Sequence, residues 1–278
     1  QVVSVDTSKR NKNSKKFIFP NKCLCGFTTK KEISMTTKKI DSVRRCTRGY
    51  ECNYTAKEKL KHIVSKDAFD IEGLGKKVID NFWKLKFIKE PGDIFNLSYK
   101  KIEKLEGWGE LSIKNLKNAI NKSKNIVLDR FIYSIGIRHI GQENAKILAN
   151  FFKSSQNFSE LFSPKKRKDI LKNLEDLDGI GETQIRSIED FFSNKKNSEI
   201  IQSLMSFLNI KNYQKNLKTG KLSNKNIMFT GGFQKMSRSE AKALAEENGA
   251  KILGTVSSKL DYLVIGNSKP TKKKITKA

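Results

Sequence analysis

Residues 177–192 read LDGIGETQIRSIEDFF, a Gly-Ile-Gly corner followed by apolar residues at helical spacing. This pattern predicts a tight turn that enters an amphipathic helix with one face to bury. Three earlier segments repeat the frame, at corners that begin 32 to 40 residues apart. They are IEGLGKKVIDNFW (71–83), LEGWGELSIKNLKNAI (105–120) and IRHIGQENAKILANFF (137–152). Spacing of this size indicates one helix-turn-helix unit per copy, four in all.

The Gly-hydrophobic-Gly corner suits phosphate binding for a physical reason. Glycine permits a positive φ and leaves the backbone uncovered, so N–H groups of the turn and of the next helix can converge on one anion. A single such turn is ordinary helix-end packing, and it is the repetition that favours DNA binding. In the third copy His139 replaces the first glycine, so one of the two glycines that define the corner is missing there. The candidate contacts are Gly73, Gly75, Gly107, Gly109, Gly141, Gly179 and Gly181.

The chain is strongly basic. Its 278 residues include 56 Lys plus Arg and 29 Asp plus Glu, a formal net charge of +27. Such an excess favours a polyanion, most simply nucleic acid, over an acidic small molecule alone, although AT-rich coding accounts for part of the lysine content. No apolar run reaches the ~18 to 20 residues of a membrane span. We therefore expect a soluble protein that binds nucleic acid. We also expect it to be a monomer in the cytoplasm, associated with the nucleoid.

All four cysteines lie within thirty residues, as a C-x-C pair and a C-x5-C pair: Cys23, Cys25, Cys46 and Cys52. Clustering favours a metal site in a reducing compartment over scattered disulfides. The surrounding segment, 17–61, has too few apolar residues for its own core, and a zinc ion held by four thiolates would replace that core. The first pair is one residue shorter than the usual C-x2-C, so a weaker, degenerate site and free cysteines remain alternatives.

The flanking segments predict different structures. Residues 1–5 read as a strand and 6–16 as a basic connection. Residues 194–222 read as a polar linker that carries one helix, at IIQSLMSFLNI (200–210). Beyond it the pattern changes to strand, helix, strand, strand, which indicates a small α/β domain over 223–278. We expect this domain to be incomplete, because 272–278 read as the first turn of another helix.

The residues predict no catalytic group. His62 and His139 are the only histidines, and each reads as a packing or turn residue. No Ser-His-Asp set, Walker loop or carboxylate-rich metal site is visible. The segment Lys259-Leu260-Asp261-Tyr262 is close to the K-x-D-G core of nucleotidyltransferases, but it lacks the glycine and lies between two expected strands, so we reject it.

The order of these modules resembles the C-terminal half of bacterial NAD+-dependent DNA ligases. Three strings carry the resemblance: LKHIVSKDAFDIEGLG (60–75), FIYSIGIRHIG (131–141) and FTGGFQKMSRSEAKALAEENGAK (229–251). The resemblance implies a mainly α, multidomain fold with the end of an OB domain and a linker in 1–16, a four-cysteine zinc finger in 17–61 and a helix-hairpin-helix domain in 62–193. A linker in 194–222 and a truncated α/β BRCT domain in 223–278 would follow.

The resemblance also implies a function, the sealing of single-strand nicks in duplex DNA during replication and repair. In that reaction a lysine takes AMP from NAD+, the AMP passes to the 5′-phosphate, and the 3′-hydroxyl displaces it with help from magnesium. We expect the residues for these steps in an adenylation domain before Gln1, so this chain alone is expected to be inactive. It would supply a DNA clamp, with Thr230 as a phosphate contact of the BRCT domain and Lys274 as its partner.

Two other functions fit the same motifs. Helix-hairpin-helix and BRCT modules also occur in non-enzymatic repair scaffolds and nuclease subunits. A basic structural protein that binds RNA is a third possibility, although single-strand RNA readers need exposed aromatic platforms on a sheet, and none is predicted here.

Overall fold

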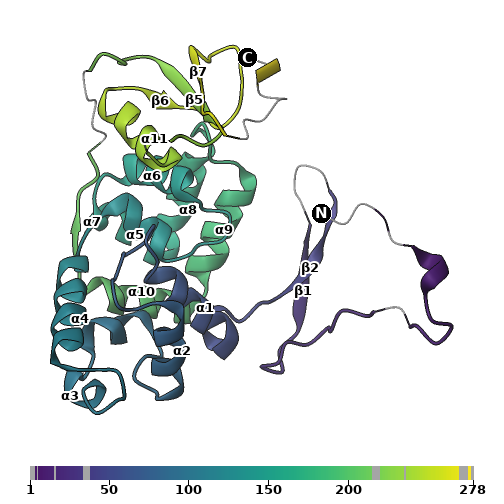
Figure 1. Cartoon of the computed structure of the whole chain (residues 1–278), viewed down its shortest axis with the longest axis vertical. Coiled ribbons are helices and arrows are strands. Elements are labelled where there is room, and N and C mark those ends of the chain that lie inside the picture. The colour runs from purple at the N-terminus through teal and green to yellow at the C-terminus, as the bar shows by residue number, and fades with distance from the viewer. Residues whose placement is uncertain are drawn as a thin grey trace. The chain divides into compact units, whose positions relative to one another are not determined.

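The computed structural model of the chain describes residues 4, 6–15, 17–33, 38–214, 220–234, 236–268 and 275–276. It divides into two compact units, residues 1–214 and 215–278 (Figure 1). The expected strand in 1–5, apart from Ser4, and the expected partner Lys274 lie outside the described residues. Within the described ranges, no helix has both the length and the hydropathy needed to cross a membrane.

The cysteine module contains little regular structure. After η1 (Thr7–Lys9), strands β1 (Thr29–Ile33) and β2 (Ile40–Cys46) form an antiparallel ladder in which Thr29 faces Cys46. Thr29 is the only buried residue of β1, and β2 buries none fully. The turn η2 (Gly49–Glu51) then leads into α1 (Asn53–Ile63). Within the described residues of this module, the two strands therefore enclose no apolar core, in line with the low apolar content of 17–61.

The rest of the first unit is helical, and the expected mainly α, multidomain fold class is confirmed. Two short strands, β3 (Asn125–Val127) and β4 (Asn209–Lys211), pair in parallel. The helical elements after α1 are α2 (Lys76–Lys84), η3 (Pro91–Asn96), α3 (Tyr99–Ile102), α4 (Glu110–Ser123), α5 (Leu128–Ser134), α6 (Gln142–Phe152), α7 (Ser155–Ser159), η4 (Glu160–Phe162), α8 (Pro164–Leu174), α9 (Glu182–Ser193) and α10 (Lys195–Met205).

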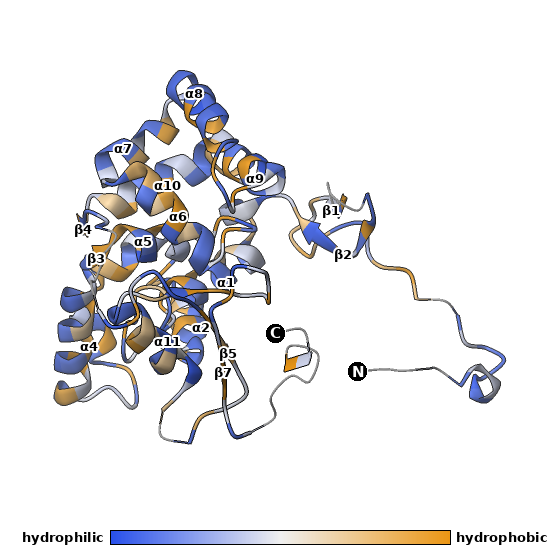
Figure 2. Ribbon diagram, turned by 90° about the horizontal axis from the view of Figure 1, so that it is seen from above, coloured by the Kyte–Doolittle hydropathy of each residue, from blue (hydrophilic) through white to orange (hydrophobic). Residues whose placement is uncertain are grey.

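One continuous apolar cluster runs from α1 to α10. Figure 2 shows how hydrophobic and hydrophilic residues alternate along these helices. Phe158 of α7 lies at a centre of the cluster, with its ring edge-on to Phe131, Phe152 and Phe192 at centroid distances of 5.3 to 5.9 Å. The spacing and tilt of these rings are those that aromatic pairs prefer. The helical repeats therefore share a single core.

Helix α10 belongs to this core, which differs from the linker expected over 194–222. Ile200, Ile201 and Leu204 are buried, and the side chain of Asn194 caps the helix by accepting a hydrogen bond from the N–H of Asn197. A short apolar face was enough to dock the helix, even though the residues around it are polar. The polar residues on either side of this apolar face are the reason that the sequence did not predict the packing of α10 into the core.

The second unit is a small α/β fold, as expected. Parallel strands lie in the order β6 (Lys251–Ile252), β5 (Asn226–Thr230), β7 (Tyr262–Ile265), and α11 (Arg238–Glu247) connects β5 to β6. Ser237 and Glu240 form a reciprocal capping box at the start of α11. The second strand of this unit is short and ends at Ile252.

Candidate nucleic-acid interface and cysteine site

Each of the four corners is a β-turn closed by one main-chain hydrogen bond. The N–H of the central apolar residue donates to the carbonyl three residues earlier: Leu74 to Ile71, Trp108 to Leu105, Ile140 to Ile137 and Ile180 to Leu177, at 3.0 to 3.2 Å. The third turn residue has positive φ in every copy: Gly73 +86°, Gly107 +82°, His139 +60° and Gly179 +91°. This is the position where a type II turn requires glycine or a residue that tolerates the left-handed region. The histidine of the third copy thus keeps the geometry of the corner.

The second glycine of each corner is the N-cap of the following helix. Gly75, Gly109, Gly141 and Gly181 precede α2, α4, α6 and α9 in extended conformations. The first N–H groups of a helix have no partner within the helix. At these four helix starts, donors of this kind therefore lie next to a residue without a side chain.

The glycines of the corners are exposed, whereas the apolar residues between them point into the protein. Leu74, Ile140 and Ile180 are at most 5% exposed, while the seven candidate glycines are all exposed. Among the described residues, six of the seven glycine N–H groups have no hydrogen-bond acceptor. The exception is Gly181, whose N–H donates to Oε1 of Gln184 at 3.1 Å. The corners therefore present main-chain donors to solvent.

Contacts between copies hold the corners in pairs. The Nδ2 of Asn144 in α6 donates to the carbonyl oxygen of Gly179 at 2.9 Å, which joins the third copy to the fourth. A Cβ added at Gly73 would lie 3.6 Å from Leu116 Cδ1 of α4, so the first copy is packed against the second. Arg130 of α5, the helix that leads into the third copy, donates to the carbonyl oxygen of Ala68, just before the first corner, at 2.9 Å. The four corners are thus parts of one packed unit.

The charges around the corners divide them into two kinds. The second corner carries two acidic residues close to its glycines, and so does the fourth: Glu106 and Glu110, and Asp178 and Glu182. The first corner has one acid, Glu72, followed by Lys76 and Lys77. The third has Arg138 in the place of that acid. Because nearby carboxylates repel an anion, the first and third corners are better placed to hold a phosphate.

The third corner has a partner from the cysteine module. Glu32 of β1 places Oε1 2.5 Å from Arg138 Nε and Oε2 3.3 Å from His139 Nε2. Partial burial raises the pKa of Glu32, but the hydrogen bond and charge of Arg138 outweigh this and lower the pKa below its usual value. Sequence reasoning missed Glu32 and Arg138, because the two residues lie far apart in the chain.

The other aromatic and imidazole groups near the repeats have structural roles. Trp108, at the second corner, packs on Phe82 with ring centroids 5.5 Å apart. His62 of α1 donates from Nε2 to the carbonyl oxygen of Tyr133 at 2.9 Å. Beside it, Lys59 donates to the carbonyl oxygen of Gly136 at 3.0 Å, and burial lowers its pKa to about 8. These contacts fasten α1 to the third repeat.

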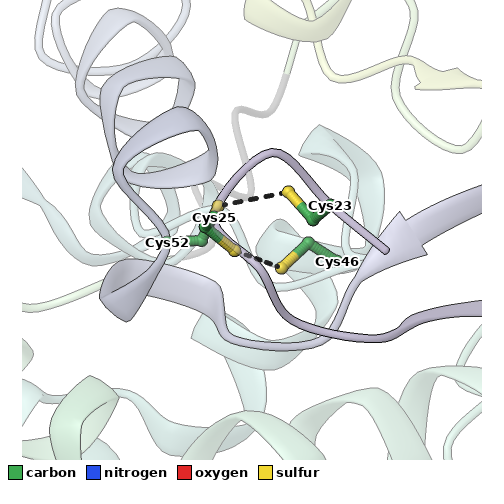
Figure 3. A group of neighbouring side chains, drawn as sticks. All are labelled: Cys23, Cys25, Cys46 and Cys52. Atoms are coloured by element: carbon green, nitrogen blue, oxygen red, sulfur yellow. Dashed lines mark hydrogen bonds between the residues drawn. The ribbon is translucent and has the colours of Figure 1, made fainter. Parts of the chain in front are cut away.

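The four cysteines meet at the junction of the strands and α1 (Figure 3). Cys23 Sγ lies 3.8 Å from Cys52 Sγ, Cys25 Sγ lies 3.6 Å from Cys46 Sγ, and all four sulfurs are within 4.8 Å of one another. Zn–S bonds of ~2.3 Å in a tetrahedron place sulfurs about 3.8 Å apart. The distances fit one metal ion held by four thiolates and are too long for disulfides.

A tight turn compensates for the short C-x-C spacer. The N–H of Gly26 donates to the carbonyl oxygen of Cys23 at 2.8 Å, and Gly26 has a φ of +84°. Leu24, between the two cysteines, is 84% exposed, so its side chain lies away from the sulfurs. One residue is therefore a sufficient spacer for both sulfurs to reach the cluster.

Cys52 has the environment of a thiolate. It is the N-cap of α1 and is fully buried. Burial raises the pKa of its thiol, but hydrogen bonds from Thr55 and Tyr54 favour the charged form and bring the pKa down to about 6. This cysteine is prepared to act as a metal ligand.

Thr230 lies at the end of β5 and is 2% exposed. The carbonyl oxygen of Gly231, next in the chain, accepts hydrogen bonds from Arg238 Nε and Nη2 at 3.1 and 2.8 Å. The N–H of Gly232 donates to the carbonyl oxygen of Ser268. The phosphate contact expected at Thr230 stays a prediction.

Two segments of the chain match known domain families. Residues 130–201 match the helix-hairpin-helix motif family, and residues 218–278 match the BRCA1 C Terminus (BRCT) domain family. The chain therefore contains one segment similar to the helix-hairpin-helix motif and one similar to the BRCT domain, in agreement with the corners and with the α/β unit described above.

Similarity to whole proteins is more specific. Over its full length the chain is 53% identical to a protein named DNA ligase from Pelagibacter ubique (strain HTCC1062), of which it covers 40%. It is 41% identical to a DNA ligase from Parvibaculum lavamentivorans over 96% of the chain and 39% of that protein, and 39% identical to one from Rickettsia bellii (strain OSU 85-389) over 100% and 41%. The chain is thus homologous to bacterial DNA ligases, which confirms the resemblance, and it spans about 40% of their length. The scaffold alternative is not favoured.

Proposed function

We propose that this chain is the DNA-binding portion of an NAD+-dependent ligase that seals single-strand nicks in duplex DNA, in the nucleoid, during replication and repair. One observation carries the proposal. Exposed main-chain donors recur at four corners of a chain whose whole length is similar to proteins named DNA ligase. Main-chain donors at helix starts bind phosphates without reading bases, which suits an enzyme that must act at any sequence.

The corners would act as anion-binding devices, the first and third more strongly than the second and fourth, whose acids oppose an anion. The free N–H groups at the turn and at the helix start would converge on one phosphate, and the helix dipole would add a partial positive charge there. The buried residues Leu74, Ile140 and Ile180 hold the turns rigid, so the donors need little rearrangement. The corners grip phosphates, and the BRCT domain, with Thr230, adds a weaker contact.

We further propose that the cysteine site holds zinc. Zinc would tie the knuckle at Cys23 and Cys25 to the end of β2 and the start of α1, and so replace the missing apolar core of residues 17–61. NAD+ and magnesium would act with an adenylation domain outside this chain. This chain would bind and position DNA and would not seal nicks alone.

The test is DNA binding as a function of salt, by fluorescence anisotropy with a nicked duplex. If the corners engage ~6 to 8 phosphates, the slope of log K against log salt is about −5 to −7. Intact duplexes of different sequence should bind with similar slopes, and single-stranded RNA should bind more weakly. A slope shallower than about −2, or a preference for RNA, would contradict a phosphate clamp.

A second measurement tests whether this chain alone lacks the chemistry that seals a nick. The chain, incubated with nicked duplex, NAD+ and magnesium, should leave the nick open, whereas a complete relative should seal it. Sealing by the chain alone would overturn the assignment of the chemistry to another domain. Sedimentation of the free chain should give the mass of one copy, 31.7 kDa.

A further inference from the structure

The third corner differs from the other three in residue type but not in backbone geometry. Its turn keeps the closing hydrogen bond and the positive φ, +60° at His139. Two cationic or protonatable side chains, Arg138 and His139, stand where the other copies have an acid and a glycine. A corner of this kind can bind an anion through its side chains as well as through the main chain.

A carboxylate of the same chain already contacts both of these side chains. The Glu32 carboxylate bridges them, with one oxygen at Arg138 Nε and the other at His139 Nε2, 2.5 and 3.3 Å away. Glu32 comes from β1 of the cysteine module, so the contact is tertiary. Oxygens of a carboxylate and of a phosphate diester accept the same charge-assisted hydrogen bonds from a guanidinium. Glu32 is thus a chemical stand-in for a backbone phosphate.

The contact can be exchanged with a ligand. The side chains of Glu32, Arg138 and His139 are 38%, 41% and 35% exposed, so water and solutes reach them. An ion pair at this exposure contributes little to stability, because water and salt screen it. Two other acids near the site have partners of their own. Glu143 on the following helix is paired with Lys146 at 3.2 Å, and Asp41 of β2, which also interacts with the charge of Arg138, is paired with Arg45 at 3.0 Å. Glu32 is therefore the carboxylate that a phosphate would have to displace.

We propose that Arg138 and His139 form a side-chain site for a DNA backbone phosphate, and that Glu32 fills this site until DNA displaces it. This inference rests on the proposed DNA-binding function. Repulsion between a carboxylate and a phosphate excludes both from the same donors. DNA binding at the third corner therefore releases Glu32, and with it the end of β1, from the helical repeats.

The test compares two charge-matched variants in anisotropy titrations with nicked duplex at low salt. Glu32→Gln removes the competing charge and should tighten binding about three- to tenfold. Glu160→Gln is the control, because Glu160 is also a half-exposed partner of a cation, Lys166 at 2.7 Å, but lies away from the corners in sequence. It should change the dissociation constant by less than about twofold. Equal effects of the two variants would overturn the proposal.

A double-mutant cycle with Arg138→Gln completes the test. Arg138→Gln alone should weaken binding, and Glu32→Gln should have no further effect in that background, since the shared site is gone. A gain from Glu32→Gln that persists without Arg138 would show a general charge effect and refute the exchange. If the unmodified chain fails to bind DNA, the proposed function itself fails. If it binds with a steep salt slope while Glu32→Gln equals Glu160→Gln, only the exchange at the third corner fails.

Discussion

The Nδ2 of Asn144 donates a hydrogen bond to the carbonyl oxygen of Gly179, and through it the helix of the third repeat holds the corner of the fourth. The same corner is tightly packed, because a Cβ on Gly179 would lie 2.6 Å from Cδ1 of Ile147, about one turn further along α6. The glycine at this position serves packing between repeats as well as turn conformation. Its counterpart Gly107 has no atom within 4 Å of such a Cβ.

The two glycines should therefore differ in their effect on stability. Gly107→Ala meets only the strain of an alanine at φ +82°, about 1 kcal/mol. Gly179→Ala must also displace Cδ1 of Ile147, but this atom ends a flexible, half-buried side chain, so we expect a loss of about 1.5 kcal/mol. Urea unfolding followed by circular dichroism measures both. Ile147→Val removes the clashing Cδ1 and should restore part of the loss in Gly179→Ala; no restoration would show that the clash is not its cause.

The backbone-donor mechanism predicts a difference between two other glycines. Gly75 and Gly109 have φ of −66° and −84° and no atom within 4 Å of an added Cβ, so valine fits both without strain. Valine would nevertheless cover the adjacent N–H groups. Gly75→Val should weaken DNA binding about tenfold, or about 1.4 kcal/mol, because Lys76 and Lys77 make this corner attractive to phosphate. Gly109→Val should have less than about a twofold effect, since Glu110 follows it.

Anisotropy titrations at several salt concentrations decide between the mechanisms. Equal losses from Gly75→Val and Gly109→Val would mean that local charge does not select the working corners. No loss from either would mean that main-chain donors are not used. The control for folding is the unfolding midpoint, which should fall by a similar, small amount in both variants, because valine is a poorer N-cap than glycine.

Metal analysis tests the cysteine site. The purified chain should contain about one equivalent of zinc, and Cys46→Ser should reduce it below about half. Leu24→Ala is the matched control, because Leu24 lies inside the C-x-C knuckle but is exposed; it should keep the metal. Since thiols must lose protons to bind zinc, the metal should be released as the pH falls. Substoichiometric zinc in the unmodified chain would refute a four-thiolate site.

Local chemistry made the corners and the cysteine cluster readable in the sequence. Glycine at a turn followed by a helical stripe has one simple structural meaning, and four repeats of it predicted the helical fold. The metal-ligand set was equally visible, but the C-x-C spacing left its geometry open. Only the turn at Gly26, with its positive φ, shows how both sulfurs reach the cluster.

Features that depend on tertiary contacts could not be predicted. Helix α10 was expected inside a linker, because Lys and Asn surround its few apolar residues, yet Ile200 and Leu204 are buried in the core. The contact of Glu32 with Arg138 joins segments far apart in the chain. The different charges of the four corners are visible in the sequence. Because the four turns have the same backbone geometry, these charges are what distinguishes the corners as phosphate sites.

Lys59 provides a pH test of how α1 is fastened to the third repeat. Its Nζ lies 5.1 and 5.3 Å from the ring centroids of Tyr50 and Phe191 and donates to the carbonyl oxygen of Gly136. Burial lowers its pKa from 10.5 to about 8, so the charged form is disfavoured in the folded state.

The sign follows from proton linkage. Below pH 8 both states hold the proton and the full cost of burying the charge opposes folding, whereas between pH 8 and 10.5 the unfolded state binds more protons, so stability rises with pH. Compared with Lys59→Met, which cannot titrate, the unmodified chain should gain about 2 kcal/mol between about pH 7.5 and 10, because one pKa unit corresponds to ~1.4 kcal/mol. Urea unfolding of both proteins across this range measures the difference. A difference that stays constant with pH would show that the ammonium group is well solvated, and that the hydrogen bond to Gly136 forms at no cost in desolvation.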